Sequence, residues 1–479
     1  MRRTLAGLLL LAGLCATASP AAGQYFGQNK VQYRRFDFQS IQTEHFDIYY
    51  YPDERTGALD AARMAERAYA RLSRILHHNF QSRKPIILYA SQSDFQQTNV
   101  VDASGEGLGG VTEFFKHRAV LPFTGSYADF EHVLQHEMVH QFQYDVYSRG
   151  RPGGGMQTLV NVNPPLWFME GMAEYLSLGP INPETAMWLR DAALEGNLPT
   201  LEQMTLDPYI FPYRYGHAIW AYIGEKWGDE VIGEILQSSA SSGIEAAIKR
   251  GLGRSIEDLS NDWRDAVQTT FLPQLGDHYR ARRVAQPALT RRRTAGRVFL
   301  APALSPDGSE IAFFGDQGGY FIDLWLANVQ TGRVKERLVK STLNSNYESL
   351  RFINSAGSFS PDGRYFAIAA KHRDRDDLVI LDVKKHREAA RLSIALNGIQ
   401  TPQWSPDGTQ LVFTGFSNGF TDLFMINRDG TGLRQLTHSS VDGAMRITTP
   451  RPAPDGTQIY VSVATTIPPM MTVDCVRPA

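Results

Sequence analysis

The spacing of hydrophobic positions in the first half of the chain predicts strands and helices in mixed order. Short apolar or alternating runs at residues 45–51, 85–89 and 111–122 are typical of strands. In longer segments, apolar residues recur three and four positions apart. This spacing predicts an amphipathic helix at residues 59–76, and further helices are predicted at residues 130–144, 166–176, 215–227 and 255–271. The mixture indicates an α+β domain.

The pattern changes in the last third of the chain, where a turn motif repeats and strand-like runs follow it. Ser305-Pro306-Asp307-Gly308 recurs at residues 360–363 and 405–408, and as Ala453-Pro454-Asp455-Gly456. Pro fixes φ and Gly admits positive φ, so each motif is a turn. After each of the first three turns an apolar strand follows, and a second strand opens with Asp-Leu. A period in the forties with paired strands predicts the blades of a β-propeller.

The fourth repeat differs from the others, because little chain follows it. Residues 459–463 supply one strand, but no Asp-Leu strand comes after it, and Pro468 and Pro469 oppose ladder pairing. We therefore expect an incomplete propeller, an open arc of about three complete blades, whereas closed propellers have about four to eight. The chain would then be a truncated form of a longer protein, or a partner would complete the arc. Truncation is favoured, because open strand edges invite aggregation.

The first residues are typical of a secretory leader. Arg2 and Arg3 precede an apolar run at residues 5–14, and small residues follow up to residue 23. An uncleaved anchor is the alternative. No later stretch reaches the roughly 20 apolar residues of a membrane helix. We expect a signal peptide at residues 1–23, an exported periplasmic or extracellular protein, and no transmembrane helix in the mature chain.

Composition and charge narrow the classes of function. The chain has 479 residues, of which 43% are hydrophobic and 20% charged, as in ordinary globular proteins. Its formal net charge of −2 does not suggest a nucleic-acid binder. An arginine-rich stretch at residues 279–295 is predicted to be a solvated linker, and a patch that steers substrate or binds lipid headgroups is the alternative. It would separate a domain at residues 24–278 from the repeats at residues 296–479.

One motif carries specific chemistry. His136-Glu137-Met138-Val139-His140 is H-E-x-x-H inside a predicted helix. Residues four apart share a helix face, so both imidazoles can reach one zinc ion (Zn²⁺) and leave room for a third ligand and a water. Glu137 is then placed to act as the general base. The third ligand is expected from a nearby helix, where Glu170 and Glu174 also lie four apart. One would bind the metal and the other would orient a histidine.

Together these motifs resemble a known peptidase type. H-E-x-x-H followed by Trp167-Phe168-Met169-Glu170-Gly171-Met172-Ala173-Glu174-Tyr175 is similar to the gluzincin metallopeptidases of the peptidase MA type. The resemblance implies a zincin-like fold, Glu170 as the third ligand, and a strand within residues 109–122 beside the cleft. The spacing of 30 positions from His140 to Glu170 exceeds that of the aminopeptidase branch. The repeats, especially residues 422–430, resemble TolB-like propeller blades.

Other residues carry weaker signals. His132 lies four residues before His136, and we interpret it as packing beside the ligands, since a fourth protein ligand would exclude water. Tyr215 or His217 could donate to the oxyanion of the reaction intermediate, or both could be ordinary helix-start residues. Residues 415–419 match the serine-hydrolase string G-x-S-x-G. A hairpin loop is the better interpretation, because a nucleophile elbow needs a strand followed by a helix.

The sequence therefore predicts a secreted zinc metallopeptidase that hydrolyses peptides or proteins, with a propeller that binds or screens substrate. Endopeptidase and exopeptidase action both remain open. The alternative is a binding or scaffold protein of the cell envelope, in which the propeller meets a protein partner and the zinc domain is secondary.

Overall fold

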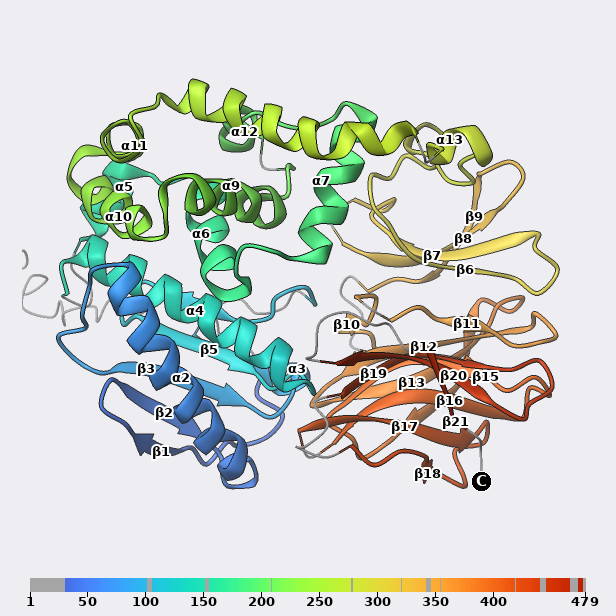
Figure 1. The fold of residues 1–479 in the computed structure, drawn as a ribbon. Coiled ribbons are helices and arrows are strands. Elements are labelled where there is room, and N and C mark those ends of the chain that lie inside the picture. Colours follow the sequence, from blue (N-terminus) through green and yellow to red (C-terminus); the bar gives the residue numbers. More distant parts are fainter. Residues whose placement is uncertain are drawn as a thin grey trace, which may run out of the picture.

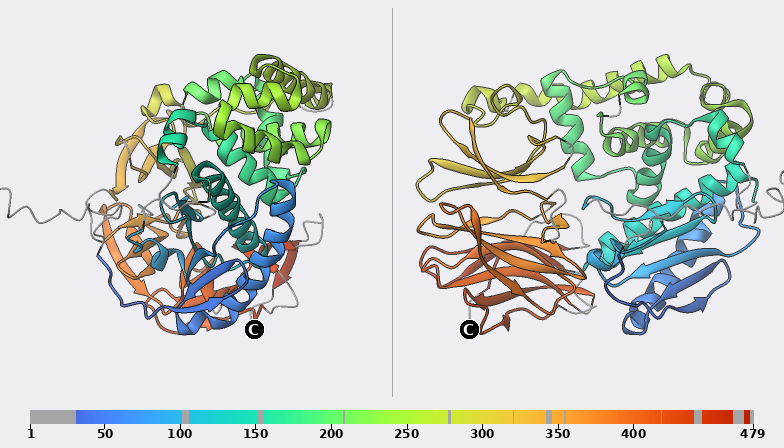
Figure 2. Two further views of the ribbon diagram at one scale, coloured as in Figure 1. Left: turned by 90° about the vertical axis from the view of Figure 1, so that its left-hand side faces the viewer. Right: turned by 180° about the vertical axis from the view of Figure 1, so that it is seen from behind.

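The computed structural model describes residues 31–476, except for 101–105, 151–154, 208, 277–278, 320, 342–345, 354, 418, 440–444 and 466–472. It has two parts that lie side by side, an N-terminal α+β region and a C-terminal array of β-sheets (Figures 1 and 2). The expected leader at residues 1–23 lies outside the described residues. Across the described part of the chain, no helix is both long and apolar enough to cross a membrane.

A five-stranded mixed sheet underlies the N-terminal region. Its strand order is β1-β2-β3-β5-β4. The central strands β2, β3 and β5 run parallel, while β1 and β4 at the two edges run antiparallel to their neighbours. Alternate side chains such as Ile86 and Leu88 are buried in the core that helices α2 and α4 share with the sheet. The strands are β1 (Gln39–Gln42), β2 (Phe46–Tyr50), β3 (Lys84–Tyr89), β4 (Val111–Glu113) and β5 (Arg118–Pro122).

The single extended segment expected at residues 111–122 is wrong. It is a hairpin, in which β4 and β5 pair antiparallel. The Glu113 carboxylate accepts hydrogen bonds from the backbone N–H groups of Phe115 and Lys116, each at 2.9 Å. His117 takes a positive φ of 51°. The turn contains neither Gly nor Pro, so the usual sequence marks of a turn are missing.

Helices cover the sheet and continue beyond it as a second layer. All five helices expected from the sequence are confirmed within a few residues of their predicted bounds, and several shorter ones were not predicted. The α-helices of this region are α2 (Arg55–Ile75), α3 (Gln92–Phe95), α4 (Tyr127–Ser148), α5 (Met156–Val162), α6 (Leu166–Leu178), α7 (Pro183–Glu195), α8 (Leu201–Leu206), α9 (Pro212–Trp227), α10 (Glu230–Ser242), α11 (Ile244–Leu252) and α12 (Ile256–Phe271). Two 3₁₀ turns, η1 (Pro52–Glu54) and η2 (Leu272–Gly276), and two one-turn helices, α13 (Ala281–Val284) and α14 (Arg291–Thr294), complete the set.

Helices α6 and α9 pack unusually closely. A Cβ atom added to Gly171 of α6 would lie 2.5 Å from the Cα atom of Gly216 on α9. Side chains at either position would force the helices apart. This contact sets the position of α6, the helix that carries Glu170, against α9.

The C-terminal part consists of four antiparallel sheets, as the repeats predict. The first contains β6 (Phe299–Leu304), β7 (Glu310–Gly315), β8 (Asp323–Asn328) and β9 (Val334–Val339). The second contains β10 (Ser349–Leu350), β11 (Ser358–Phe359), β12 (Tyr365–His372), β13 (Arg375–Asp382) and β14 (Arg387–Ser393). The third contains β15 (Gly398–Trp404), β16 (Gln410–Ser417), β17 (Phe420–Asn427) and β18 (Arg434–Gln435). The fourth contains β19 (Met445–Pro452), β20 (Ile459–Thr465) and β21 (Val473–Val476).

The repeated residues have repeated structural roles. In the first turn, Ser305 Oγ donates to Asp307 Oδ1 at 2.6 Å, and Gly308 takes a φ of 71°. The aspartate of each Asp-Leu pair is buried and binds the chain of the outer strand. Asp323, for example, accepts hydrogen bonds from the backbone N–H and the hydroxyl of Ser341. Asp422 accepts the same two hydrogen bonds from Ser439, and Asp377 accepts one from the hydroxyl of Ser393.

The sheets follow one another as an open row. β6 packs against β11, β12 packs against β15, and β15, β16 and β17 pack against β19. Over the described residues the sheets therefore do not close into a ring. The expectation of an open array is confirmed. What would complete it stays a prediction.

Candidate metal centre

Two histidines project from one face of α4. The hydroxyl of Ser126 caps the start of this helix by accepting a hydrogen bond from the backbone N–H of Asp129. His136 and His140 follow in the buried middle of the helix, and their ring centroids lie 4.8 Å apart. The i, i+4 spacing brings both rings to one point, as expected.

Glu170 of α6 completes a group of three donor atoms. Its Oε2 atom lies 3.1 Å from His136 Nε2 and 3.2 Å from His140 Nε2, and the two Nε2 atoms are 3.1 Å apart. Ligands bound to a tetrahedral zinc ion at about 2.0–2.1 Å must lie about 3.3 Å from one another. The structure thus brings together the three residues named from the sequence, as a buried group that could hold a metal ion.

The orientation of His140 is fixed by an amide side chain. Gln143 Nε2 donates to the carbonyl oxygen of Met169 at 3.0 Å, so its Oε1 atom is left to accept from His140 Nδ1 at 2.8 Å. With the proton on Nδ1, the Nε2 atom of His140 presents a lone pair to the group. That is the tautomer that binds a metal.

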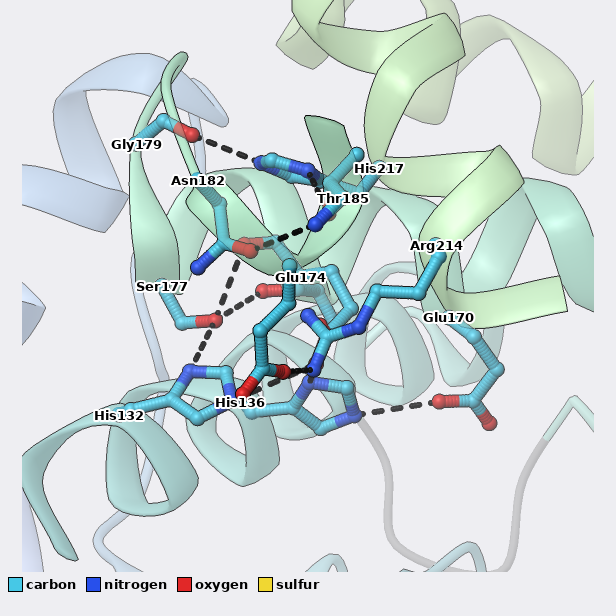
Figure 3. A network of polar contacts seen from close by, with 12 residues as sticks. His132, His136, Glu170, Glu174, Ser177, Gly179, Asn182, Thr185, Arg214 and His217 are labelled. Carbon is cyan, nitrogen blue, oxygen red and sulfur yellow. Dashed lines mark hydrogen bonds and ion pairs between the residues drawn. The ribbon is translucent and has the colours of Figure 1, made fainter. Parts of the chain in front are cut away.

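A carboxylate on the same helix as Glu170 orients His136 instead of joining the group. Glu174 Oε1 lies 3.1 Å from His136 Nδ1, and Arg214 Nη1 donates to Glu174 Oε2 at 2.9 Å (Figure 3). His132 Nε2 lies 3.4 Å from Glu174 Oε1, and its Nδ1 atom lies 3.0 Å from Ser177 Oγ. His132 therefore lies beside the ligands and not among them, as interpreted from the sequence.

The charges of the group favour a cation at its centre. Burial alone would lower the pKa of His136, but the Glu170 and Glu174 carboxylates beside its two ring nitrogens raise it to about 10. Burial alone would raise the pKa of Glu170, but His140 and His136 hold it well below its usual range. Two carboxylates therefore stay ionised around the imidazoles. Either a proton or a metal ion would balance their charge.

Glu137 lies next to this group, on the side of the edge strand β4. Thr112 Oγ1 donates to Glu137 Oε2 at 2.7 Å. A Cβ atom added to Gly110 would lie 2.9 Å from both Cγ and Oε1 of Glu137, so only glycine lets the chain pass here. Burial raises the pKa of Glu137, while His140 and His136 oppose that rise. The Glu137 carboxylate is thus buried, and Thr112 of β4 holds it by a hydrogen bond.

The structure places the two residues named for the oxyanion away from the three donor atoms. Both ring nitrogens of His217 are engaged, Nδ1 with Thr185 Oγ1 at 2.9 Å and Nε2 with the carbonyl oxygen of Gly179 at 2.8 Å (Figure 3). The ring of Tyr215 lies edge-on to Trp188.

Tyr213 lies at the group, and the sequence analysis missed it. Its ring stacks on His136 at 5.9 Å between centroids, and burial together with the nearby charges of Glu170 and Glu137 raises the pKa of its hydroxyl. One sequence signal could have found it. Gly216, three residues on, marks the face of α9 that meets α6, and Tyr213 shares that face.

Comparison with known proteins assigns the C-terminal part. The family PD40, described as a TolB beta propeller domain, matches residues 290–473. Tol-Pal system protein TolB of Anaeromyxobacter dehalogenans (strain 2CP-C) is 27% identical over 161 residues, which are 30% of this chain and 36% of that protein. The same protein of Syntrophus aciditrophicus is 36% identical over 50 residues, which are 10% of this chain and 11% of the relative. The chain thus spans about a third or less of the length of these relatives.

Two solved TolB structures are also similar. TolB from Agrobacterium tumefaciens aligns with 35% of this chain and 55% of its own, at 21% identity and a TM-score of 0.30. TolB from Acinetobacter baumannii aligns with 38% of this chain and 44% of its own, at 20% identity and the same TM-score. The family match alone makes the C-terminal sheets TolB-like repeats, and that match does not extend to the three donor atoms.

Proposed function

We propose that this chain is a zinc-dependent peptidase of the gluzincin type, with His136, His140 and Glu170 as the ligands. One observation carries the proposal: three buried donor atoms with the mutual spacing of zinc ligands lie beside the buried carboxylate of Glu137. Zinc accepts two imidazoles and one carboxylate in catalytic sites that keep a fourth position open.

Different residues of the chain have different roles in the proposed hydrolysis. A zinc ion held there would supply Lewis acidity toward the peptide carbonyl and make water more acidic. Glu137 accepts the proton of the attacking water and passes it to the leaving amine. Burial raises the pKa of Glu137 above its usual range, which makes the carboxylate a better proton acceptor than an exposed glutamate. The hydroxyl of Tyr213, in place of Tyr215 or His217, donates to the oxyanion.

The edge strand β4 is the proposed place of the substrate. In the sheet, β4 pairs on one side with β5 and is the last strand of the order. An extended peptide can add to such an edge by backbone hydrogen bonds. Thr112 of this strand touches Glu137, so a peptide added there would pass the proposed base. The substrate class is therefore a peptide or an extended segment of a protein.

A second function is supported by the repeats. In it, the chain is a binding or scaffold protein of the cell envelope that meets a protein partner through the TolB-like sheets, whose family match supports it. Both functions suit an exported, periplasmic or extracellular protein, which rests on the leader pattern at residues 1–23.

Zinc content and peptide turnover separate the two functions. The purified chain is expected to hold about one zinc and to cleave a mixed peptide library, and Glu137→Gln should keep the zinc. Loss of a general base typically costs about 10²–10⁴-fold in rate. A zinc-loaded chain without turnover would favour the scaffold. Full activity in Glu137→Gln would refute the role of Glu137.

A further inference from the structure

One carboxylate ties the loop before β4 to the array of β-sheets. The Glu106 oxygens accept hydrogen bonds from the backbone N–H of Phe352, at 2.7 and 2.9 Å, and of Ile353, at 3.1 Å. Phe352 and Ile353 follow β10, so these bonds join parts of the chain that are about 250 residues apart in sequence. Glu106 is therefore a direct link between the two parts of the molecule.

The array side of this link is firmly held. Arg351, next to Phe352, is buried and donates to Asp376 Oδ1 through Nε at 2.9 Å and Nη2 at 2.7 Å. Ser93 of α3 donates to the same carboxylate oxygen at 2.9 Å. The Arg351–Asp376 bonds join two charged groups, and such charge-assisted bonds are stronger than neutral ones. The two N–H groups that face Glu106 thus come from a fixed stretch of backbone.

The other end of the loop reaches the proposed base. From Glu106, four residues lead to Gly110, whose backbone lies against the side chain of Glu137. Between them, the carbonyl oxygen of Leu108 accepts from Gln92 Nε2 at 3.0 Å. Two residues beyond Gly110, Thr112 donates to the Glu137 carboxylate. A shift at Glu106 would therefore reach Glu137 through a short piece of chain.

Packing supports this loop only in part. A cavity of about 280 Å³ lies between the loop and the array, lined by Gly107, Leu108, Gly109, Ile353 and Phe416 among others. Where a cavity replaces packed side chains, hydrogen bonds carry more of the restraint on the backbone. The bonds at Glu106 span the joint beside this cavity.

We infer that Glu106 is a positioning residue, through which the TolB-like array holds the 106–110 loop and thereby places Glu137 for catalysis. Only the catalytic part of this inference, the placement of Glu137, rests on the proposed peptidase function. Glu106 touches neither the donor atoms nor Glu137 among the described contacts, so it acts through the loop. In this arrangement the array is a structural part of the active site.

The test uses the full chain with Glu106→Ala, Glu106→Gln and the control Tyr33→Phe. Tyr33 Oη donates to Glu348 Oε1 at 2.7 Å, so the control removes another hydrogen bond between the two parts but leaves the loop untouched. A displacement of about 1 Å in a catalytic group can cost about 10²-fold in rate. We expect Glu106→Ala to lower kcat about tenfold or more with KM within about twofold, and Glu106→Gln to restore most of kcat.

A second measurement needs no activity. Amide hydrogen exchange in residues 107–113 should become faster in Glu106→Ala than in the wild type and in Tyr33→Phe, while zinc content stays at the wild-type level. Unchanged exchange in these residues, or an equal loss of kcat in Tyr33→Phe, would overturn the inference. If the wild type cleaves no peptide, the proposed function fails. The exchange result alone then decides whether the array holds the loop.

Discussion

Glu170 and Glu174 offer a sharp comparison, because they are four residues apart on α6 and do different work at the same histidine. Glu170 Oε2 faces His136 Nε2 at 3.1 Å, whereas Glu174 Oε1 faces His136 Nδ1 at 3.1 Å. The first contact is that of a ligand, and the second orients the ring. We predict that Glu170→Ala weakens zinc binding more than Glu174→Ala does.

The sizes of the two effects follow from these roles. Structural zinc sites bind with about 10–16 kcal/mol, which is roughly 2.5–4 kcal/mol for each of four ligands. Loss of Glu170 should therefore weaken zinc binding by about 10²–10³-fold. A carboxylate that orients a ligand histidine typically contributes about 10–100-fold to metal affinity. Glu174→Ala should fall in that lower range.

The assay is competition for zinc against a coloured chelator, with each variant first shown to fold like the wild type. Glu184→Ala is the matched control. Glu184 binds the same guanidinium as Glu174, with Arg214 Nη2 donating at 2.6 Å, but it is largely exposed. Its loss should leave zinc affinity within about twofold of the wild type.

The order of the losses in zinc affinity among the three variants tests the assignment of Glu170 as the ligand. If Glu174→Ala loses more affinity than Glu170→Ala, Glu174 is the ligand and the assignment on α6 is reversed. If Glu184→Ala loses as much as Glu174→Ala, the effect comes from Arg214 and not from the contact with His136. Equal, small effects of all three variants would mean that the group does not hold zinc through α6.

Three further predictions concern packing, the repeats and pH. Gly171→Ala should lower stability by about 1–3 kcal/mol or more, because its Cβ atom would meet the backbone of α9, while Gly276→Ala, with open space around it, should be neutral in thermal unfolding. Asp377→Ala should destabilise the array by about 2 kcal/mol in urea unfolding, since the buried Asp377 carboxylate binds Arg391 and Ser393. Burial raises the pKa of Glu106 from 4.5 to about 7, so the folded chain binds the extra proton. The stability due to this group is complete below about pH 4.5 and is lost as pH rises toward 7, and Glu106→Gln should remove that slope in chemical denaturation at several pH values.

The ligands could be predicted because their spacing is local. His136, Glu137 and His140 lie within one helical turn and a half, so helix geometry alone fixes which side chains meet. Glu170 was harder, since it depends on how α6 packs on α4. The residues alone left Glu170 and Glu174 open, and only the resemblance to gluzincins chose between them.

Tyr213 shows why the rest of the site could not be predicted from local spacing in the sequence. Tyr213 and Tyr215 are two residues apart on α9, so they point to nearly opposite sides of the helix. Gly216 marks one face of α9 in the sequence, but that this face meets α6 and the metal group depends on its contact with Gly171, which is a tertiary contact. The hairpin at β4 and β5 escaped prediction for a related reason. Its turn is made by the Glu113 side chain instead of Gly or Pro.

The repeats were predictable as strands, but their relation to the N-terminal region was not. The period of the turns and the Asp-Leu pairs reports on each sheet separately, because both are local to one sheet. No repeat feature marks Arg351 or Phe352 as the place where the array meets the loop of Glu106. Such a contact joins two regions whose sequence patterns are independent of each other, so it is found only in the three-dimensional structure. The contacts that connect the array to the loop beside Glu137 are therefore seen only in the three-dimensional structure, although the sequence contains every residue that makes them.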